Sequence, residues 1–195
     1  RRKMEDFLLK HATDVKVLDI GCRNSPYAHL FPNRVGVDIV PGTGVDVVCS
    51  TYDLPFDTSS FEYILCTEVL EHLSDPQKAV NEMHRVLARS GTLILTTRFL
   101  YGRHGEPDDY FRYTPEGLTH LLRDFRIISI EPEAQGINTL AVILESYALE
   151  QDISLFRWSK GNSSCGLKAS AFRWDVYGGQ YIECLFISRY RGRIY

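Results

Sequence analysis

The chain has 195 residues, of which 44% are hydrophobic and 24% charged, a composition typical of one globular domain and not of a disordered chain. Its formal net charge is −3, so it lacks the basic excess that nucleic-acid binding normally requires. No run of 18 apolar residues occurs, and we predict no membrane-spanning helix. The five cysteines are scattered without a CxxC pair, so we expect reduced thiols and a cytoplasmic protein. Nothing in the composition indicates an oligomeric state.

Strand-like and helix-like segments alternate along most of the chain. Apolar and β-branched runs predict seven strands, over residues 15–20, 34–38, 45–49, 61–66, 91–97, 125–131 and 181–188. Apolar residues at helical spacing, or a proline at a helix start, predict helices over residues 4–11, 25–30, 75–89 and 114–123. This alternation predicts an α/β fold with a mainly parallel sheet.

One long segment interrupts the alternation. Residues 132–180 contain one predicted helix, 137–149, followed by a Gly/Ser-rich passage at 159–166. A structureless loop of this length is unusual in a compact domain. We therefore expect a single domain over residues 1–195, in which residues 132–180 form a lid or an acceptor-site insertion.

The turn after the first strand is a candidate ligand site. The segment DIGC at 19–22 ends that strand, and Ser25-Pro26 is a typical helix start whose free N–H groups can hold an anionic group. Asp38 ends the second strand, 19 residues after Asp19, a spacing at which a carboxylate can accept hydrogen bonds from ribose hydroxyls. The pair indicates an adenosine-containing cofactor, whereas a turn-capping Asp19 and a solvated Asp38 are the structural alternatives.

A dinucleotide site is the obvious competing interpretation. It requires the pattern GxGxxG, so that the backbone can approach a pyrophosphate. The turn here reads GCRNSP over residues 21–26 and keeps only the first glycine. NAD is therefore weakly supported.

A longer set of motifs resembles the class I S-adenosylmethionine-dependent methyltransferases, specifically the type 11 group. The matching segments are VLDIGC at 17–22, VD at 37–38, DLPF at 53–56, EVLEHLSDP at 68–76 and EMHRVL at 82–87. Each piece is weak alone, but their order and spacing are specific, and the similarity covers about residues 15–125. The resemblance implies a Rossmann-like, seven-stranded, mainly parallel sheet with helices on both faces and an antiparallel last strand. It also implies S-adenosylmethionine as the cofactor.

The resemblance implies a set of cofactor-binding residues, namely Asp19, Gly21, Asp38, Asp53, Leu54, Thr67 and Glu68. Asp19 and Gly21 would lie near the methionine half of the cofactor, and Asp38 on its ribose. Asp53 would lie near the adenine amino group, and Leu54 would add a backbone contact to the adenine. The last two residues of the set, at the end of the fourth strand, would form the floor of the transfer site.

Arg23 departs from the family pattern, which usually has a glycine at this position. An arginine adopts a positive φ less easily than a glycine, so we expect it to point outward or to pair with the cofactor carboxylate. The departure motivates one alternative function, a non-catalytic scaffold that binds the cofactor.

Methyl transfer is a displacement, in which alignment of the acceptor with the methyl donor supplies much of the acceleration. An oxygen acceptor must also lose a proton, and His72 is the candidate base, with a structural role as the alternative. Residues 98–113 follow the fifth strand and are rich in polar and aromatic groups that would line the acceptor site, although ion pairs such as Arg112 with Asp109 would also suit a surface loop. Similar segments occur in type 11 proteins that resemble enzymes of sugar or lipid modification. We therefore expect O-methylation of a small-molecule or glycan-like acceptor.

A metal-assisted reaction is the second alternative. Glu68, Glu71 and His72 stand at i, i+3 and i+4, so in a helix they would share one face, and His104 could add a fourth ligand. This pattern resembles the metal-binding cluster of plant-type small-RNA 2′-O-methyltransferases. The acidic charge balance counts against RNA, and the same string occurs in family members in which it implies no metal. We therefore predict no metal, with His72 and His104 lining the acceptor pocket.

Overall fold

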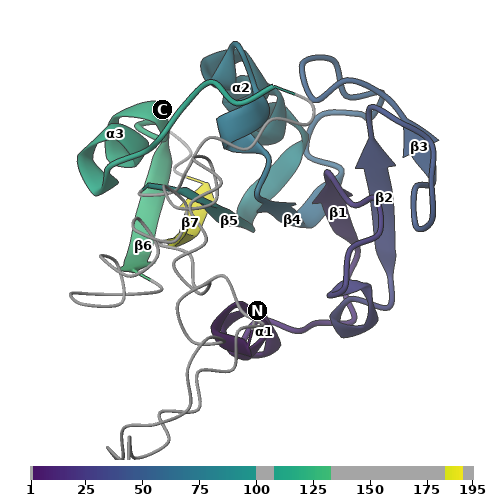
Figure 1. The fold of residues 1–195 in the computed structure, drawn as a ribbon. Helices are drawn as coiled ribbons and strands as arrows, with labels where there is room; N and C mark the ends of the chain where they lie inside the picture. Colours follow the sequence, from purple (N-terminus) through teal and green to yellow (C-terminus); the bar gives the residue numbers. More distant parts are fainter. Residues whose placement is uncertain (1, 100–107, 133–182, 191–195) are drawn as a thin grey trace, which may run out of the picture.

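The computed structural model of the chain describes residues 2–99, 108–132 and 183–190. They form a seven-stranded sheet in the order β3-β2-β1-β4-β5-β7-β6 (Figure 1). The strands are β1 (Val17–Ile20), β2 (Arg34–Asp38), β3 (Val47–Val48), β4 (Phe61–Thr67), β5 (Leu87–Arg98), β6 (Phe125–Pro132) and β7 (Glu183–Tyr190). The first five strands are parallel to one another, and β7 runs antiparallel to both β5 and β6. The predicted parallel arrangement and the antiparallel last strand are confirmed.

Three α-helices are described, α1 (Arg2–Leu9), α2 (Pro76–Val86) and α3 (Pro115–Leu121). Two of them begin as the sequence predicts, with proline in the first turn and a capping side chain before it. Asp75 accepts a hydrogen bond from the Lys78 N–H at 3.1 Å, and Thr114 accepts one from the Gly117 N–H at 3.0 Å. No helix among the described residues is long and apolar enough to cross a membrane.

The helices contact different faces of the sheet. Val17, Leu65 and Ile94 are buried with the apolar residues of α1, whereas their strand neighbours Leu18 and Ile64 are buried with α2 and α3. Successive residues of a strand point to opposite faces, so α1 covers one face and α2 and α3 cover the other. Figure 1 shows this separation, with α1 below the sheet and the other two helices above it.

The helix predicted over residues 25–30 is wrong. This stretch holds only the single 3₁₀ turn η1 (Ala28–Leu30). The side chain of Phe31 is fully buried, and Pro32 follows it, which disfavours helical backbone at Phe31. The turn after β1 is therefore not the N-terminus of an α-helix, and the predicted anion site that depends on a helix dipole is wrong as well.

The boundary between α2 and β5 also differs from the prediction. The helix predicted over residues 75–89 ends at Val86, and β5 begins at Leu87 instead of at residue 91. Leu87 is buried and pairs with Phe61, so strand pairing overrides the local helical pattern. The register shifts before Thr92, where Ser90 takes a left-handed conformation with a φ of 65°.

Strand β3 is shorter than the predicted residues 45–49. Asp46 is bonded to Gly36 instead of extending the strand: its carboxylate accepts from the Gly36 N–H at 2.7 Å, and its own N–H donates to the Gly36 carbonyl at 2.8 Å. The predicted helix over residues 137–149 and nearly all of the proposed segment 132–180 lie outside the described residues, as does His104.

Candidate functional site

The order of the strands places a ligand site at the carboxyl ends of β1 and β4. The connections leave these two neighbouring strands in opposite directions along the sheet, and open α/β sheets bind ligands in the crevice at such a point. Gly21 follows β1 with a φ of 72°, and a Cβ atom placed on it would lie 2.3 Å from Cγ2 of Val69, just beyond β4. The position therefore accepts only glycine, and the two loops approach each other closely there.

Arg23 does not strain the turn. The residue with a positive φ is Asn24, at 59°, and asparagine adopts this conformation more readily than most residues. Arg23 is exposed, and its aliphatic part lies against Gly42, where an added Cβ would be 2.7 Å from Cγ of Arg23. The exposed side chain fits the outward placement, and pairing with the cofactor carboxylate stays a prediction.

Asp38 is held at the end of β2 by the backbone. Its Oδ2 accepts a hydrogen bond from the Arg23 N–H at 3.3 Å, and its Oδ1 accepts one from the Val40 N–H at 3.0 Å. Each carboxylate oxygen has two lone pairs, so both can accept a further bond. The side chain is partly exposed and lies next to the turn after β1, as the sequence predicts.

Asp19 is not at the surface of the site. Its side chain is 1% exposed, and its Oδ2 pairs with Nη1 of Arg34 at 3.1 Å. Burial raises the pKa of Asp19 to about 6, and the Arg34 guanidinium limits the increase. The second oxygen, Oδ1, is buried without a hydrogen-bond partner among the described residues. This buried oxygen is therefore an acceptor whose desolvation is not compensated by a hydrogen bond from the described residues.

The loop predicted to contact adenine is fastened to α2. Leu54 is buried, its N–H donates to Oε2 of Glu82 at 3.0 Å, and its carbonyl accepts from Nη2 of Arg85 at 2.8 Å. The Arg85 guanidinium lowers the pKa of Glu82, which keeps this pair charged. Asp53 is exposed beside this loop, and its N–H donates to the Ser50 carbonyl at 3.1 Å. Any adenine contact through the Leu54 N–H competes with the Glu82 carboxylate.

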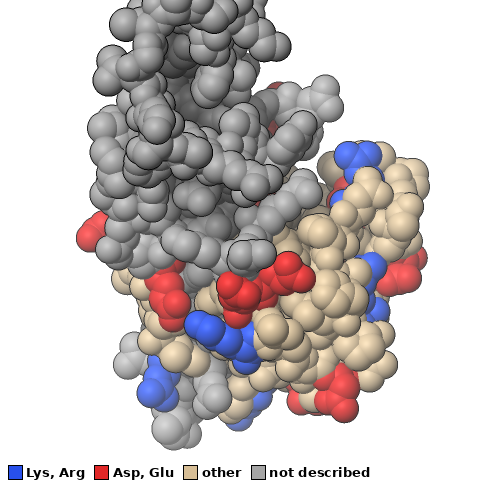
Figure 2. All heavy atoms as spheres, turned by 60° about the horizontal axis from the view of Figure 1, so that its bottom comes forward, with Lys and Arg blue, Asp and Glu red and all other residues tan. Residues whose placement is uncertain are grey.

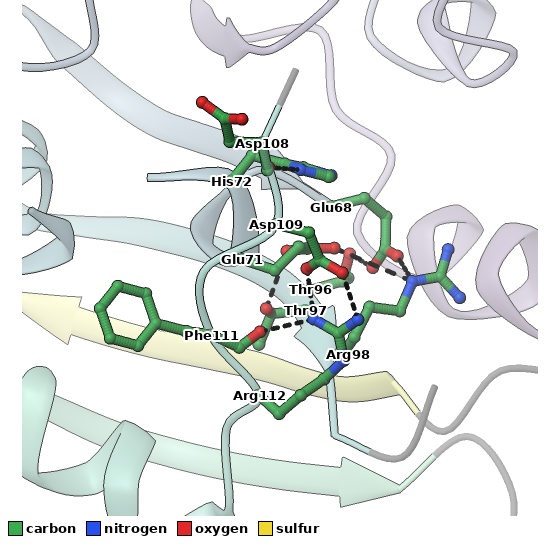
Figure 3. A network of polar contacts seen from close by, with 10 residues as sticks. All are labelled: Glu68, Glu71, His72, Thr96, Thr97, Arg98, Asp108, Asp109, Phe111 and Arg112. Carbon is green, nitrogen blue, oxygen red and sulfur yellow. Dashed lines mark hydrogen bonds and ion pairs between the residues drawn. The ribbon is translucent and has the colours of Figure 1, made fainter. Parts of the chain in front are cut away.

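Glu68 directs its carboxylate toward β5 (Figure 3). Thr67 ends β4, and Glu68 follows it with a φ of 56°, a left-handed conformation that is unusual outside glycine and asparagine. Its Oε1 accepts a hydrogen bond from Oγ1 of Thr96 at 2.9 Å, and its Oε2 pairs with Nε of Arg98. The left-handed backbone is therefore stabilised by two side-chain contacts from β5.

Glu71 lies near the same arginine nitrogen (Figure 3). Its side chain is fully buried, its Oε2 accepts from Oγ1 of Thr97 at 2.9 Å, and its Oε1 is 3.8 Å from Nε of Arg98. Burial raises the pKa of Glu71, and the Thr97 hydroxyl and the Arg98 charge oppose that increase. Nε of Arg98 thus faces two carboxylates at the carboxyl edge of the sheet.

The His72 ring contacts the backbone of residues 108–113. Its Nδ1 is hydrogen-bonded to the carbonyl of Asp108, and because a carbonyl only accepts, Nδ1 is the donor. The shared face that a helix would give Glu68, Glu71 and His72 does not form, because Glu68 is left-handed and a single 3₁₀ turn, η2 (Leu70–His72), follows it. Within residues 2–99, 108–132 and 183–190, no group of three or more His, Cys, Asp or Glu side chains is placed to hold a metal ion.

Residues 108–113 are docked on η2. The N–H groups of Tyr110 and Phe111 both donate to the Glu71 carbonyl, at 2.8 and 3.2 Å, and the hydroxyl of Tyr113 donates to the Leu70 carbonyl at 3.1 Å. Tyr110 is 51% exposed and Phe111 39% exposed, with ring centroids 6.4 Å apart. The segment therefore presents two aromatic rings from a backbone fixed by hydrogen bonds.

The ion pair of Arg112 with Asp109 that would suit a surface loop is present, so residues 108–113 also contain an internal contact. Sequence reasoning missed the partners of two other arginines. Arg34 and Arg98 stand at the ends of strands whose neighbours are apolar, and a buried guanidinium needs a carboxylate. That requirement was a usable signal, although the sequence does not identify which carboxylate each arginine meets.

The model of the methyltransferase domain family matches residues 18–95, which run from β1 into β5 and include the turn and the β4 edge. Residues 18–95 therefore resemble a methyltransferase domain. An uncharacterized protein of Methanocaldococcus jannaschii, MJ1123, is 32% identical over 96 residues, which are 45% of this chain and 47% of that protein. A putative methyltransferase of Encephalitozoon cuniculi is 31% identical over 107 residues, 49% of each chain. The chain thus spans about half the length of these curated relatives.

Solved structures with the same architecture include a 1,6-didemethyltoxoflavin-N1-methyltransferase of Burkholderia thailandensis with bound S-adenosylhomocysteine. It has a TM-score of 0.64 and 14% identity over 98% of this chain and 78% of that one. The [4+2]-cyclase SpnF has a TM-score of 0.63 and 20% identity over 96% of this chain and 80% of that one. At these identities the likeness shows the Rossmann-like methyltransferase fold alone. Since the two neighbours are named for different reactions, the fold does not determine the reaction.

Proposed function

We propose that the protein is an S-adenosylmethionine-dependent methyltransferase that methylates a hydroxyl group of a small-molecule or glycan-like acceptor. The observation that carries the proposal is the geometry between β1 and β4. Gly21 has no room for a side chain there, and Asp38 is oriented beside the same turn. The family match over residues 18–95 supports the same cofactor.

The polar groups of this site fit the cofactor. Asp38 has acceptor capacity for the two ribose hydroxyls, and the Asp19 carboxylate, buried beneath the turn, attracts a cationic group such as the cofactor ammonium through its charge. Asp53 is the proposed group near the adenine, and Thr67 and Glu68 are proposed to form the floor at the end of β4. When bound, S-adenosylmethionine supplies an electrophilic methyl group. The chain has to orient the acceptor and remove its proton.

His72 is the proposed base. With Nδ1 donating to the Asp108 carbonyl, a neutral imidazole accepts a proton at Nε2. The same hydrogen bond holds the ring in place, as orienting partners do for other histidine bases. His104 remains the second proposed catalytic residue, and it lies outside the described residues.

The docked segment supports an acceptor that contains a ring. Tyr110 and Phe111 are exposed on the segment that also contacts His72, and aromatic rings stack on other rings. Figure 2 shows acidic and basic side chains intermixed on the described part of one face, without a continuous basic surface there. We therefore prefer a small ring-bearing acceptor to RNA.

Cofactor binding is the first test. Mass spectrometry of the denatured, freshly purified protein should detect S-adenosylhomocysteine or S-adenosylmethionine, and calorimetry should measure binding of S-adenosylhomocysteine but not of NAD. Absence of binding by both methods would reject the assignment.

Methyl transfer is the second test. Transfer of a radiolabelled methyl group should be measured with hydroxylated sugars, hydroxylated aromatics and RNA as acceptors, in the wild type and in His72→Ala. We expect transfer to a hydroxylated ring compound, reduced about 10²–10⁴-fold in the variant. Cofactor binding without transfer to any acceptor would favour the scaffold alternative, and transfer to RNA alone would contradict the acceptor class.

A further inference from the structure

Arg34 connects the cofactor turn to a second loop. It begins β2, and its Nη1 pairs with Oδ2 of Asp19 on β1 at 3.1 Å. Its Nη2 donates to the carbonyl of Gly44, in the connection between β2 and β3, at 2.9 Å. The side chain is 14% exposed, so the guanidinium makes these contacts in a largely water-excluded position.

The same connection supports the turn directly. The Asn24 N–H donates to the Thr43 carbonyl at 3.1 Å, and Sγ of Cys22 donates to the Gly44 carbonyl at 3.2 Å. Gly44 therefore accepts from both Cys22 and Arg34. Residues 22–24 are thus hydrogen-bonded to residues 42–44. Arg34 joins residues 42–44 to Asp19, because it contacts both the Gly44 carbonyl and the Asp19 carboxylate.

The packing around the guanidinium requires glycine. A Cβ on Gly36 would lie 2.6 Å from Nη1 of Arg34 and 2.2 Å from the Gly44 carbonyl oxygen. Gly44 has a φ of 83°, and a Cβ there would lie 2.5 Å from Nη2 of Arg34. Gly36 and Gly44 thus leave the space that the Arg34 guanidinium occupies. The contacts of Arg34 therefore depend on both glycines.

We propose that Arg34 is a positioning residue for the cofactor: it holds the Asp19 carboxylate and the supporting loop in the arrangement that binds the methionine half. This inference rests on the proposed function and adds to it a residue that does not touch the ligand. It also accounts for a turn that lacks the second glycine of the family pattern, because the support comes from residues 42–44 instead of from a glycine at position 23.

The charge of Arg34 gives the inference a measurable signature. Within the part of the chain that the structure describes, the titratable groups that face Asp19 are the Arg34 guanidinium from β2, the Cys22 thiol from the turn and the Cys66 thiol from β4. Of these, only Arg34 is cationic. Burial already raises the pKa of Asp19 to about 6 with Arg34 present. Removal of the arginine raises it further, so Asp19 becomes protonated near neutral pH and loses its attraction for a cationic donor.

The experiment is calorimetric titration with S-adenosylhomocysteine from pH 6.0 to 8.5. We expect Arg34→Met to weaken binding about tenfold or more at pH 7 and to recover part of the loss by pH 8.5. Asp19→Asn should weaken binding without this pH dependence, and adding Arg34→Met to it should add only a smaller, pH-independent loss from the missing contact with the Gly44 carbonyl. Arg89→Met, which replaces an exposed arginine before the main part of β5, is the matched control and should bind as the wild type does.

A loss in Arg34→Met that is equal at every pH would indicate a merely structural role and overturn the inference, as would binding within twofold of the wild type. If Arg34→Met does not fold, Arg34→Lys decides, because it keeps the charge but not the paired N–H groups. We expect it to bind severalfold more weakly with the pH profile of the wild type, and unchanged affinity would overturn the inference. A wild type that binds no S-adenosylhomocysteine would instead reject the proposed function itself.

Discussion

At the scale of single residues, the site depends on carboxylates whose surroundings differ. Asp38 is partly exposed and oriented by two backbone N–H groups, whereas Asp19 is buried and depends on one arginine. In the proposed function, Asp38 accepts hydrogen bonds from the ligand at the surface of the turn. Asp19 carries its charge only because Arg34 offsets part of the desolvation cost.

Asp38→Ala should weaken binding of S-adenosylhomocysteine by about 1.5–3 kcal/mol, the range for a hydrogen bond to a charged group. Isothermal calorimetry of the purified variant measures this directly. Asp14→Ala, which removes an exposed carboxylate before β1, serves as the control and should leave the affinity unchanged. Equal affinities of Asp38→Ala and the wild type would remove Asp38 from the ribose site.

Asp19 also predicts a pH dependence of folding. Its pKa rises from 3.8 in the unfolded chain to about 6 in the folded protein, so the folded state binds this proton more tightly. The stabilisation from Asp19 is complete below pH 3.8 and is lost as the pH rises through 6, a change of about 3 kcal/mol. Urea unfolding at pH 4, 5, 6 and 7 should show that Asp19→Asn gains stability relative to the wild type across this window. A constant difference between the two proteins would contradict the raised pKa.

At the scale of elements, loops after the strands are held by side chains from neighbouring elements. Arg85 of α2 donates to the carbonyls of Leu54 and Phe56, at 2.8 and 2.7 Å, while Glu82 accepts from the Leu54 N–H. The DLPF segment at 53–56 and the EMHRVL segment at 82–87 are therefore joined in the structure, because side chains of the second bind the backbone of the first. One helix turn of α2 satisfies the backbone of the loop that follows β3.

Arg85→Ala should lower the free energy of unfolding by about 1–3 kcal/mol, because two loop carbonyls lose their donor. Urea denaturation at pH 7 provides the measurement. Arg89→Ala removes an exposed arginine four residues later and should change stability by less than about 0.5 kcal/mol. If both variants unfold at the same urea concentration, the contacts of Arg85 contribute nothing to stability.

At the scale of the whole molecule, the sheet brings distant segments to one edge. The ends of β1, β2, β4 and β5 supply the proposed cofactor and acceptor residues, and residues 108–113 return to the same edge after β5 (Figures 1 and 3). A ligand at this edge contacts loops that are far apart in sequence. It therefore binds the folded state and not the unfolded chain.

Saturation with S-adenosylhomocysteine should accordingly stabilise the protein against unfolding. At a ligand concentration 100 times the dissociation constant, the gain is about 2.7 kcal/mol. Thermal unfolding with increasing ligand provides the measurement, and NAD at the same concentrations is the control. A melting temperature that does not respond to S-adenosylhomocysteine, or responds equally to NAD, would contradict the proposed cofactor.

Features that depend on neighbouring residues could be predicted from the sequence. The apolar run that forms β1 and the caps of α2 and α3 are local, since a cap needs only a side chain two or three residues before the N–H that it accepts from. The placement of Asp38 at the end of β2 follows from the same local pattern. The Rossmann-like arrangement follows from the alternation of these elements and from the family motifs.

Only the tertiary structure decided how the chemical groups face one another. Glu68, Glu71 and His72 are close in sequence, but their side chains have different partners. The left-handed backbone of Glu68 directs its carboxylate toward β5, whereas the His72 ring is hydrogen-bonded to the Asp108 carbonyl. The partners of Arg34 and Arg98 are set by strand order, which joins segments separated by many residues. Backbone patterning is a local property of the chain, whereas the direction of a buried charged side chain depends on which opposite charge the folded sheet places within its reach.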